Sequence, residues 1–207
     1  MKNIRLFYLL CLSLILVFGS SPYALADEPL LKDIPLLWNP TEDVRTFKAV
    51  DLTIYHDIYF MVKPFKDFRK NPAEIGVNIE RKGTSQDLPV TTKDNVAQWL
   101  TFNFSRTLSN FGVNVLQDKG NLTLEADILN FFVTEKSVYK GLVALKVRLL
   151  SKSNAVLWEQ MVSGDSTRFG RSYTAPNYYE ALSNSVIYAV YSLLRNDSFQ
   201  RAVQKGK

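Results

Sequence analysis

Residues 122–162 read LTLEADILNFFVTEKSVYKGLVALKVRLLSKSNAVLWEQMV. Apolar and polar side chains alternate in three parts of this stretch, Leu122–Ile128, Val143–Leu149 and Val156–Val162. A period of two residues indicates a strand with one buried face and one solvated face. Only short polar segments separate the three parts, as in hairpins. We therefore expect an antiparallel meander of three strands.

Upstream of this meander, the chain contains one further strand pattern and one long irregular segment. A fourth strand is expected over Leu52–Val62, where apolar side chains again alternate with polar ones. Residues 27–50 contain three prolines, which suit an extended lead-in better than a helix or a central strand. From Lys63 to Lys93 no period persists among prolines, glycines and charges. Long irregular segments are often functional, so this segment is a candidate binding region.

Two amphipathic helices are expected on either side of the meander. In the first, Thr91 and Asp94 stand in the spacing of a capping box, and Gly112 supplies the stop. The second has its N-terminal capping signal at Asn177, with Glu180 three residues later. Both have an apolar face at helical spacing, which comprises Val96, Leu100, Phe104, Leu108 and Phe111 in the first and Leu182, Val186, Ala189, Val190, Leu193 and Leu194 in the second.

These elements predict a single α+β domain over residues 51–207. The expected order is β-α-β-β-β-α, in which an antiparallel sheet of about four strands has two helices packed on one face. A short basic tail is expected after Asp197. A chain of this length is sufficient for one hydrophobic core and does not require a second domain.

The N-terminus has the pattern of a secretory signal peptide over residues 1–26. Lys2 and Arg5 precede an apolar run, and residues 24–26 read ALA, a small-x-small cleavage site. We expect cleavage after Ala26, which gives a periplasmic protein with no transmembrane span. Lipid attachment at Cys11 is the less favoured alternative, because only residues 6–10 would form an apolar region that normally needs roughly 7–15 residues.

Charge and composition argue against several functional classes. Without the signal peptide, 23 Lys and Arg stand against 20 Asp and Glu, a net charge of +3. The basic residues are interspersed with acidic ones, so we expect no nucleic-acid partner. His56 is the only histidine and the chain after residue 26 has no cysteine, so the usual zinc sites lack ligands. Neither a P-loop nor a nucleophile elbow is present. We therefore expect no catalytic residue, no metal and no cofactor.

The segment from Gly164 to Ser172 is the second candidate binding region. Its Arg168 and Arg171 lie close to glycines and could bind a carboxylate or a phosphate in bidentate fashion. The alternative is a structural loop in which both arginines are ion-paired. Together with Asp67 and Arg69 of the first region, these arginines are the candidate binding residues.

Several short strings resemble, in their order and spacing, the YajG-type candidate lipoproteins of Gram-negative bacteria. The strings are FKDFR at 65–69, IG at 75–76, VTT at 90–92, NV at 95–96, WL at 99–100, LW at 157–158, Gly164, GR at 170–171 and YYEALS at 178–183. The resemblance spans most of the mature chain and implies a non-enzymatic envelope protein of unsettled role. Members of that family carry a lipobox cysteine at the mature start, whereas Asp27 follows the cleavage site here, so lipid anchoring is not carried over.

The sequence thus predicts a non-enzymatic periplasmic accessory or binding protein. Its partner would be another envelope component, recognised through residues 63–93 or 164–172. Two other classes stay open. One is a hydrolase of envelope polymers that uses carboxylates such as Asp57, Asp67 or Asp165. The other is a carrier of a small ligand, which requires a large apolar cavity. The identity of the partner and the oligomeric state stay open as well.

Overall fold

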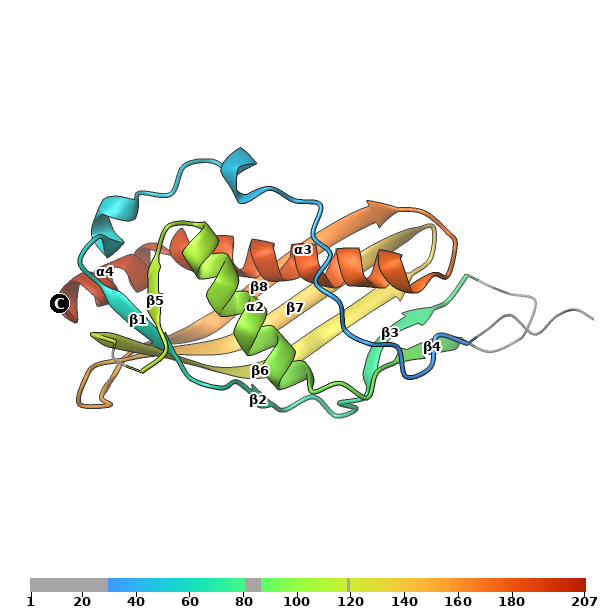
Figure 1. Cartoon of the computed structure of the whole chain (residues 1–207), viewed down its shortest axis with the longest axis horizontal. Helices are drawn as coiled ribbons and strands as arrows, with labels where there is room; N and C mark the ends of the chain where they lie inside the picture. The colour runs from blue at the N-terminus through green and yellow to red at the C-terminus, as the bar shows by residue number, and fades with distance from the viewer. Residues whose placement is uncertain (1–29, 81–86, 119) are drawn as a thin grey trace, which may run out of the picture.

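The computed structural model describes residues 30–80, 87–118 and 120–207 (Figure 1). The expected signal peptide and its cleavage site lie outside the described residues. The described chain forms one eight-stranded mixed sheet together with three α-helices. The expected antiparallel sheet of about four strands with two helices, in the order β-α-β-β-β-α, is therefore wrong.

Three long strands form one side of this sheet, with β8 at its edge. They are β6 (Leu122–Glu135), β7 (Val138–Leu150) and β8 (Val156–Phe169), and each pairs in antiparallel fashion with the next. The expected meander is confirmed, but β8 continues through most of the segment that we expected to be a loop from Gly164. This continuation is possible because Gly164 has no side chain, so the backbone around Ser185 can lie directly against the strand.

Three short strands follow one another along the free edge of β6, all parallel to it. They are β1 (Tyr59–Val62), β2 (Lys66–Asp67) and β3 (Glu74–Asn78). Pro64 and Pro72 fall between them. Since proline cannot donate to a strand ladder, it divides one extended path into three short pieces.

Two more short strands complete the sheet. β4 (Leu88–Thr91) is antiparallel to β3, and β5 (Asn114–Leu116) is parallel to β1. The segment 63–93 was therefore wrongly expected to lack regular structure, since it contains β2, β3 and β4. The strand that we expected over Leu52–Val62 is confirmed only in its second part, which is β1. Leu52–Tyr55 is a 3-10 helix, because the Asp51 carboxylate accepts from the amide of Thr53 and caps it.

The first helix, α2 (Val96–Asn110), begins later than the expected capping box. Its N-cap is Asn95, whose Oδ1 accepts from the amide of Gln98 at 3.0 Å. Asp94 instead accepts from the amide of Leu36 at 2.7 Å. The expected stop at Gly112 is confirmed, and its φ of +91° is the left-handed conformation that favours glycine.

The C-terminal helices also differ in detail from the expected ones. The second expected helix is α3 (Ala175–Leu194), which begins before Asn177, with Thr174 as its N-cap. The expected basic tail is instead a third helix, α4 (Asp197–Lys205), capped by Asn196. It is a helix because one face is apolar, and Phe199 on that face packs against Trp158 at a centroid distance of 5.1 Å.

The helices cover one face of the sheet, and the N-terminal segment lies over the helices (Figure 1). α3 packs on β8 and β7, and α2 packs on α3 and β5. Residues 36–47, named here the strap, cross both helices. Trp38 contacts Trp99 of α2 at 5.7 Å between ring centroids, and the amide of Asn39 donates to Ser183 Oγ of α3 at 3.0 Å. The other face of the sheet, the open face, has no helix among the described residues.

Candidate functional site

Asp67 and Arg69, two of the predicted binding residues, are bonded to each other beside β6. Arg69 Nε and Nη2 donate to the two carboxylate oxygens of Asp67 at 2.9 and 2.7 Å. The same guanidinium donates to the main-chain carbonyls of Glu74, Pro72 and Phe131. These five bonds use every donor of a guanidinium, and its side chain is only 7% exposed. Arg69 therefore joins segments of the sheet to one another.

Arg168, at the end of β8, is also engaged within the fold. Its Nε donates to a carboxylate oxygen of Glu180 on α3, and its Nη1 donates to the carbonyl of Phe169 at 3.0 Å. The guanidinium carbon lies 5.9 Å from the ring centroid of Tyr139. These contacts tie the end of the meander to the first turns of α3.

Arg171 is the most exposed of the four predicted binding residues. Its side chain is 67% exposed and its Nη1 lies 3.4 Å from Glu80 Oε1. Within the described part of the chain, no contact joins Arg168 or Arg171 to the pair of Asp67 and Arg69. The structure therefore does not bring the four residues together into one site.

The open face of the sheet carries a network of charges that spans four neighbouring segments. Arg148 on β7 binds Asp127 on β6 in bidentate fashion, at 2.7 and 2.9 Å. Lys63 Nζ lies 2.7 Å from Glu125 Oε1. Hydrogen bonds from Arg148 and Lys63 hold the carboxyl pKa values of Asp127 and Glu125, respectively, below their ordinary ones. Lys146 and Glu159 extend the network to β8 at 2.9 Å.

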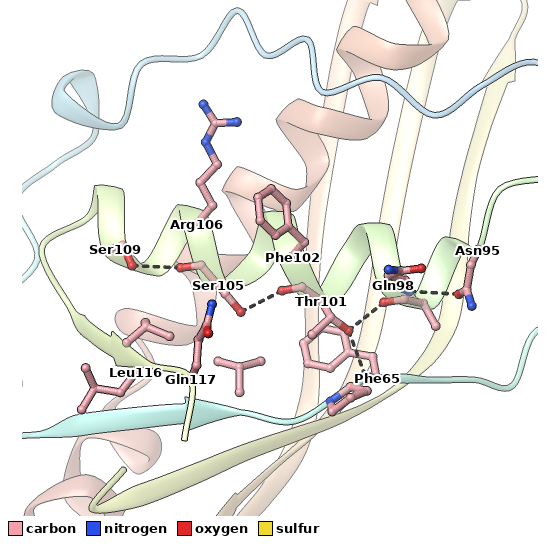
Figure 2. A pocket seen from close by; sticks show the side chains of 14 residues that line it. Phe65, Asn95, Gln98, Thr101, Phe102, Ser105, Arg106, Ser109, Leu116 and Gln117 are labelled. Atoms are coloured by element: carbon pink, nitrogen blue, oxygen red, sulfur yellow. Dashed lines mark hydrogen bonds between the residues drawn. The ribbon is translucent and has the colours of Figure 1, made fainter. Parts of the chain in front are cut away.

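A groove of about 670 Å³ lies beside α2, on the side of that helix that faces β1 and β5 (Figure 2). The helix contributes one wall, which consists mainly of Gln98, Thr101, Phe102, Ser105, Arg106 and Ser109. The opposite side comes from the end of β1, the residues that follow it, and β5 with the residue after it. These are Val62, Pro64, Phe65, Val115, Leu116 and Gln117. Most of this second side is apolar.

The hydroxyl groups on the helix wall are bonded to the helix itself. Thr101 Oγ1 donates to the carbonyl of Ala97 at 2.7 Å, and Ser105 Oγ donates to the carbonyl of Thr101 at 2.8 Å. Ser109 Oγ repeats the pattern toward Ser105 at 3.2 Å. Across the groove, the amide of Phe65 donates to Thr101 Oγ1 at 2.9 Å (Figure 2). The hydroxyl protons of this wall are therefore all donated within α2, although the side chains that carry them are polar.

Two large apolar side chains are exposed at the rim of the groove. Phe102 is 66% exposed and Leu116 is 42% exposed. Arg106 is the one lining residue with an ionisable side chain, and the structure gives it no carboxylate partner among the described residues. Its guanidinium carbon lies 6.0 Å from the ring centroid of Trp38 on the strap. In Figure 2, Arg106 and Phe102 extend from the side of α2 opposite to Phe65.

Sequence reasoning missed this groove, although one signal of it is visible along α2. The buried face of the helix contains Leu100, Phe104 and Leu108 at steps of four residues. Phe102 falls on the opposite side of that pattern, where a polar residue is typical of a solvated helix face. A single exposed apolar side chain is common on protein surfaces, so Phe102 marks the groove only together with the apolar residues across from it.

The structure offers little for metal binding or for acid–base chemistry. No group of three His, Cys, Asp or Glu side chains that could hold a metal occurs within residues 30–80, 87–118 and 120–207. His56 Nδ1 lies 2.9 Å from Asp57 Oδ1, and both side chains are exposed. None of the described helices is long and apolar enough to cross a membrane.

Comparisons with known proteins give only distant likenesses. No family model matches the sequence, and a comparison with curated proteins finds no match. A DUF330 protein from Xanthomonas campestris is similar at 14% identity and a TM-score of 0.49, over 66% of this chain and 81% of that one. A candidate lipoprotein from Caulobacter crescentus is 12% identical with a TM-score of 0.41, over 54% of this chain and 84% of its own.

A third similar structure is PelC from Paraburkholderia phytofirmans, which was solved as a dodecamer. It is 14% identical with a TM-score of 0.36, over 68% of this chain and 88% of its own. None of the three is named as a YajG-type protein, so that resemblance stays a prediction. Because these scores lie below 0.5, we argue the function of this chain from its own residues.

Proposed function

We propose that this chain is an exported, non-enzymatic binding protein of the cell envelope and that the groove beside α2 is its binding surface. The observation that carries the proposal is the groove itself, with Phe102 exposed at its rim. Its volume of about 670 Å³ falls within the roughly 300–1,000 Å³ of typical ligand sites. The export signal expected over residues 1–26 supports an envelope location.

The groove replaces the two regions that the sequence favoured. Segment 63–93 contains three strands, and segment 164–172 largely continues β8. Arg69 and Arg168 are engaged by main-chain and carboxylate groups of the fold. Buried polar groups that are fully bonded contribute to stability and leave nothing for a partner. The groove, in contrast, exposes apolar surface that has no packing partner in the described chain.

The absence of acid–base pairs along the groove supports a role in binding. General acid–base catalysis needs at least one titratable group within reach of the reacting atoms and tuned for proton transfer. Arg106 is the one ionisable residue of the lining, and a guanidinium stays protonated. The carboxylates of the hydrolase alternative lie on separate elements: Asp57 follows a 3-10 helix, Asp67 on β2 is bonded to Arg69, and Asp165 is on β8. The arrangement therefore favours capture of a partner over its cleavage.

A photocrosslinking experiment in the native host tests this proposal. A photoreactive phenylalanine analogue replaces Phe102 or Leu116 in the groove, and Met161 on the exposed open face serves as the matched control. We expect one dominant adduct from the two groove positions, identified by intact mass, and none from Met161. The adduct should disappear when Ser105→Trp fills the groove. Equal labelling at all three positions, or none in the groove, would overturn the proposal.

A further inference from the structure

We propose that one part of the open face docks on the surface of a bilayer that contains anionic phospholipids. This part is named here the apolar half, and it comprises Phe68, Leu129, Phe132, Val138, Leu142 and Phe169. The inference adds a membrane contact to the groove of the proposed function and does not depend on that groove. Two properties lead to it, namely apolar side chains that project from this half and lysines around it that have no ion pair in the described chain.

Strand pairing places the middle of the apolar half on the face of the sheet that no described helix covers. Successive side chains of a strand point to opposite faces. Val133 on β6 and Val143 on β7 are fully buried in the core. Their neighbours Phe132 and Leu142 are paired with each other and are only half-buried. These two side chains therefore lie on the open face.

Three large apolar side chains of this half project into solvent. Phe169 pairs with Val138 at the end of β8 and is 85% exposed. Leu129 is 43% exposed, because a β-bulge after Ile128 leaves it as the extra residue of β6. Phe68 lies beside it, since its amide donates to the carbonyl of Ile128 at 3.0 Å, and it is 63% exposed. A group of exposed apolar side chains, unlike a single one, indicates a contact with a protein or a membrane.

Three exposed lysines surround the apolar half, and none of them has an ion pair within the described residues. Lys66 is on β2, Lys136 is in the turn between β6 and β7, and Lys140 is on β7. The exposed carboxylate of Asp165 on β8 offsets one of these charges. The apolar half therefore carries an excess of positive charge, in contrast to the paired network on the rest of the open face.

The charges decide which occupant fits this surface. In a symmetric dimer through this half, the same surface of both copies would meet, and the lysines of the two copies would repel one another. An anionic bilayer offers negative charge to the lysines and an apolar interior to Phe68 and Phe169. Basic side chains are attracted to an anionic membrane surface, and aromatic ones enter the boundary between head groups and acyl chains. The apolar half therefore fits the surface of an anionic bilayer.

Sedimentation with vesicles tests the inference on the purified protein. The vesicles consist of phosphatidylcholine alone or of phosphatidylcholine with about 30% phosphatidylglycerol, which supplies the negative charge. We expect binding to the mixed vesicles at low ionic strength, and binding at least about tenfold weaker when the salt is raised to about 0.5 M, because salt screens the attraction. Binding that is equal for the two kinds of vesicle, or absent from both, would overturn the proposal.

A pair of lysine variants tests the position of the membrane contact. Lys136→Gln should weaken binding to the mixed vesicles about fivefold, which is the effect of one basic residue near an anionic surface. Lys152→Gln is the matched control. Lys152 is also exposed and also lies in a turn of the meander, between β7 and β8 at its other end (Figure 1). Equal losses for the two variants would show that only the net charge matters, which would overturn the assignment to the apolar half.

A pair of uncharged variants tests the apolar contribution. Phe169→Ser should weaken binding to the mixed vesicles about tenfold, because a buried phenylalanine side chain is lost from the contact. Met161→Ser is the matched control, since Met161 is 55% exposed on the same face but pairs with Lys146 of the charge network. It should bind as the unmodified protein does, and circular dichroism confirms that each variant is folded. An unchanged affinity of Phe169→Ser would exclude the apolar half as the docking surface.

Photocrosslinking separates this inference from the proposed function and from a protein partner. A photoreactive phenylalanine analogue at Phe169, in the native host, should label phospholipid. One dominant protein adduct from this position would overturn the bilayer as the occupant. Phe102→Ser in the groove should leave vesicle binding unchanged. If the vesicles do not bind but the groove positions still crosslink to one envelope protein, the membrane contact is wrong and the binding function of the groove stands.

Discussion

The open face of the sheet and the groove beside α2 are opposite kinds of surface. The open face is rich in charge, and Lys63, Lys146 and Arg148 all have carboxylate partners there. The groove is mostly apolar on the side of β1 and β5, and Arg106, the one ionisable residue of its lining, extends from the side of α2 opposite to Phe65 (Figure 2). The difference shows that the charged side chains of a surface can all be paired with one another and so be unavailable to a partner. In this protein, we infer the binding surface from apolar exposure rather than from the density of arginines.

The largest effect on stability is expected for Arg69→Ala. This change removes five hydrogen bonds and leaves the Asp67 carboxylate, which is largely buried, without its cation. Loss of one partner of such a pair costs roughly 2–4 kcal/mol of unfolding free energy. Urea denaturation measures it, and Lys66→Ala on the neighbouring strand β2 is the control because Lys66 is exposed. Equal losses for both variants would contradict the structural role of Arg69.

A smaller effect, with a characteristic pH dependence, is expected for Arg148→Met. The folded-state pKa of Asp127 is lowered mainly by its hydrogen bonds with Arg148. A carboxyl with a lowered pKa stabilises the fold above its unfolded pKa of about 3.9 and loses this contribution as the pH falls through the folded value. The variant should lose about 1–2 kcal/mol at pH 7.

Thermal melts between pH 7 and pH 2 measure this effect. The difference between Arg148→Met and the unmodified protein should start to shrink as the pH falls below about 4 and should vanish below the lowered pKa of Asp127, where Asp127 is protonated in both proteins. Lys140→Met is the matched control, since Lys140 is exposed on the same strand and has no ion pair in the described chain. A constant difference at every pH would exclude the ion pair as its cause.

The two arginines of the segment 164–172 should differ in their contribution to the free energy of unfolding. Arg168→Ala removes the bonds to Glu180 and to the carbonyl of Phe169, and we expect a loss of about 1 kcal/mol. Arg171→Ala should change stability by less than about 0.5 kcal/mol, because its one pair is long and exposed. Chemical denaturation measures both. The reverse order would show that the loop at Arg171 is the structural element.

The smallest effect on stability is expected for Phe102→Asp, which should nevertheless abolish binding in the groove. Phe102 is 66% exposed and contributes little to the core, so the free energy of unfolding should change by less than about 0.5 kcal/mol. Denaturation checks the first statement, and photocrosslinking from Leu116 in the Phe102→Asp variant checks the second. Phe169→Asp, at another strongly exposed phenylalanine, should change neither stability nor binding in the groove. If Phe102→Asp destabilises the fold, Phe102 contributes to the packing of α2 and is not part of the binding surface.

The meander of β6, β7 and β8 could be predicted from the sequence because its pattern is local. Leu122, Leu124, Ala126 and Ile128 alternate with polar residues and are all buried. The strands β1, β2 and β3 could not be predicted in the same way. They are four, two and five residues long, and the strand that all three pair with is β6. A short strand that is stabilised by pairing with a strand about 60 residues away shows little alternation of apolar and polar residues in its own sequence.

The candidate site was less predictable than the fold, for two reasons. The first is that an arginine in a polar segment looks the same whether its donors are free or used, and Arg69 is fully bonded only because Pro72 and Phe131 are brought to it. The second is that the groove joins α2 to residues around Pro64 and to β5. Its walls become neighbours through the pairing of β1 with β5, which no short stretch of sequence encodes.

The parallel pairing along β6 also dictates an order of events when the chain is made. Translation delivers the N-terminus first, but β1, β2 and β3 can pair with β6 only after its residues, 122–135, have been made. The strap must wait longer still, since its bond from Asn39 to Ser183 of α3 spans 144 positions. Contacts so distant in sequence form slowly. The last third of the polypeptide therefore completes the structure of the first third. The long-range contacts of the N-terminal strands and of the strap are absent during most of synthesis.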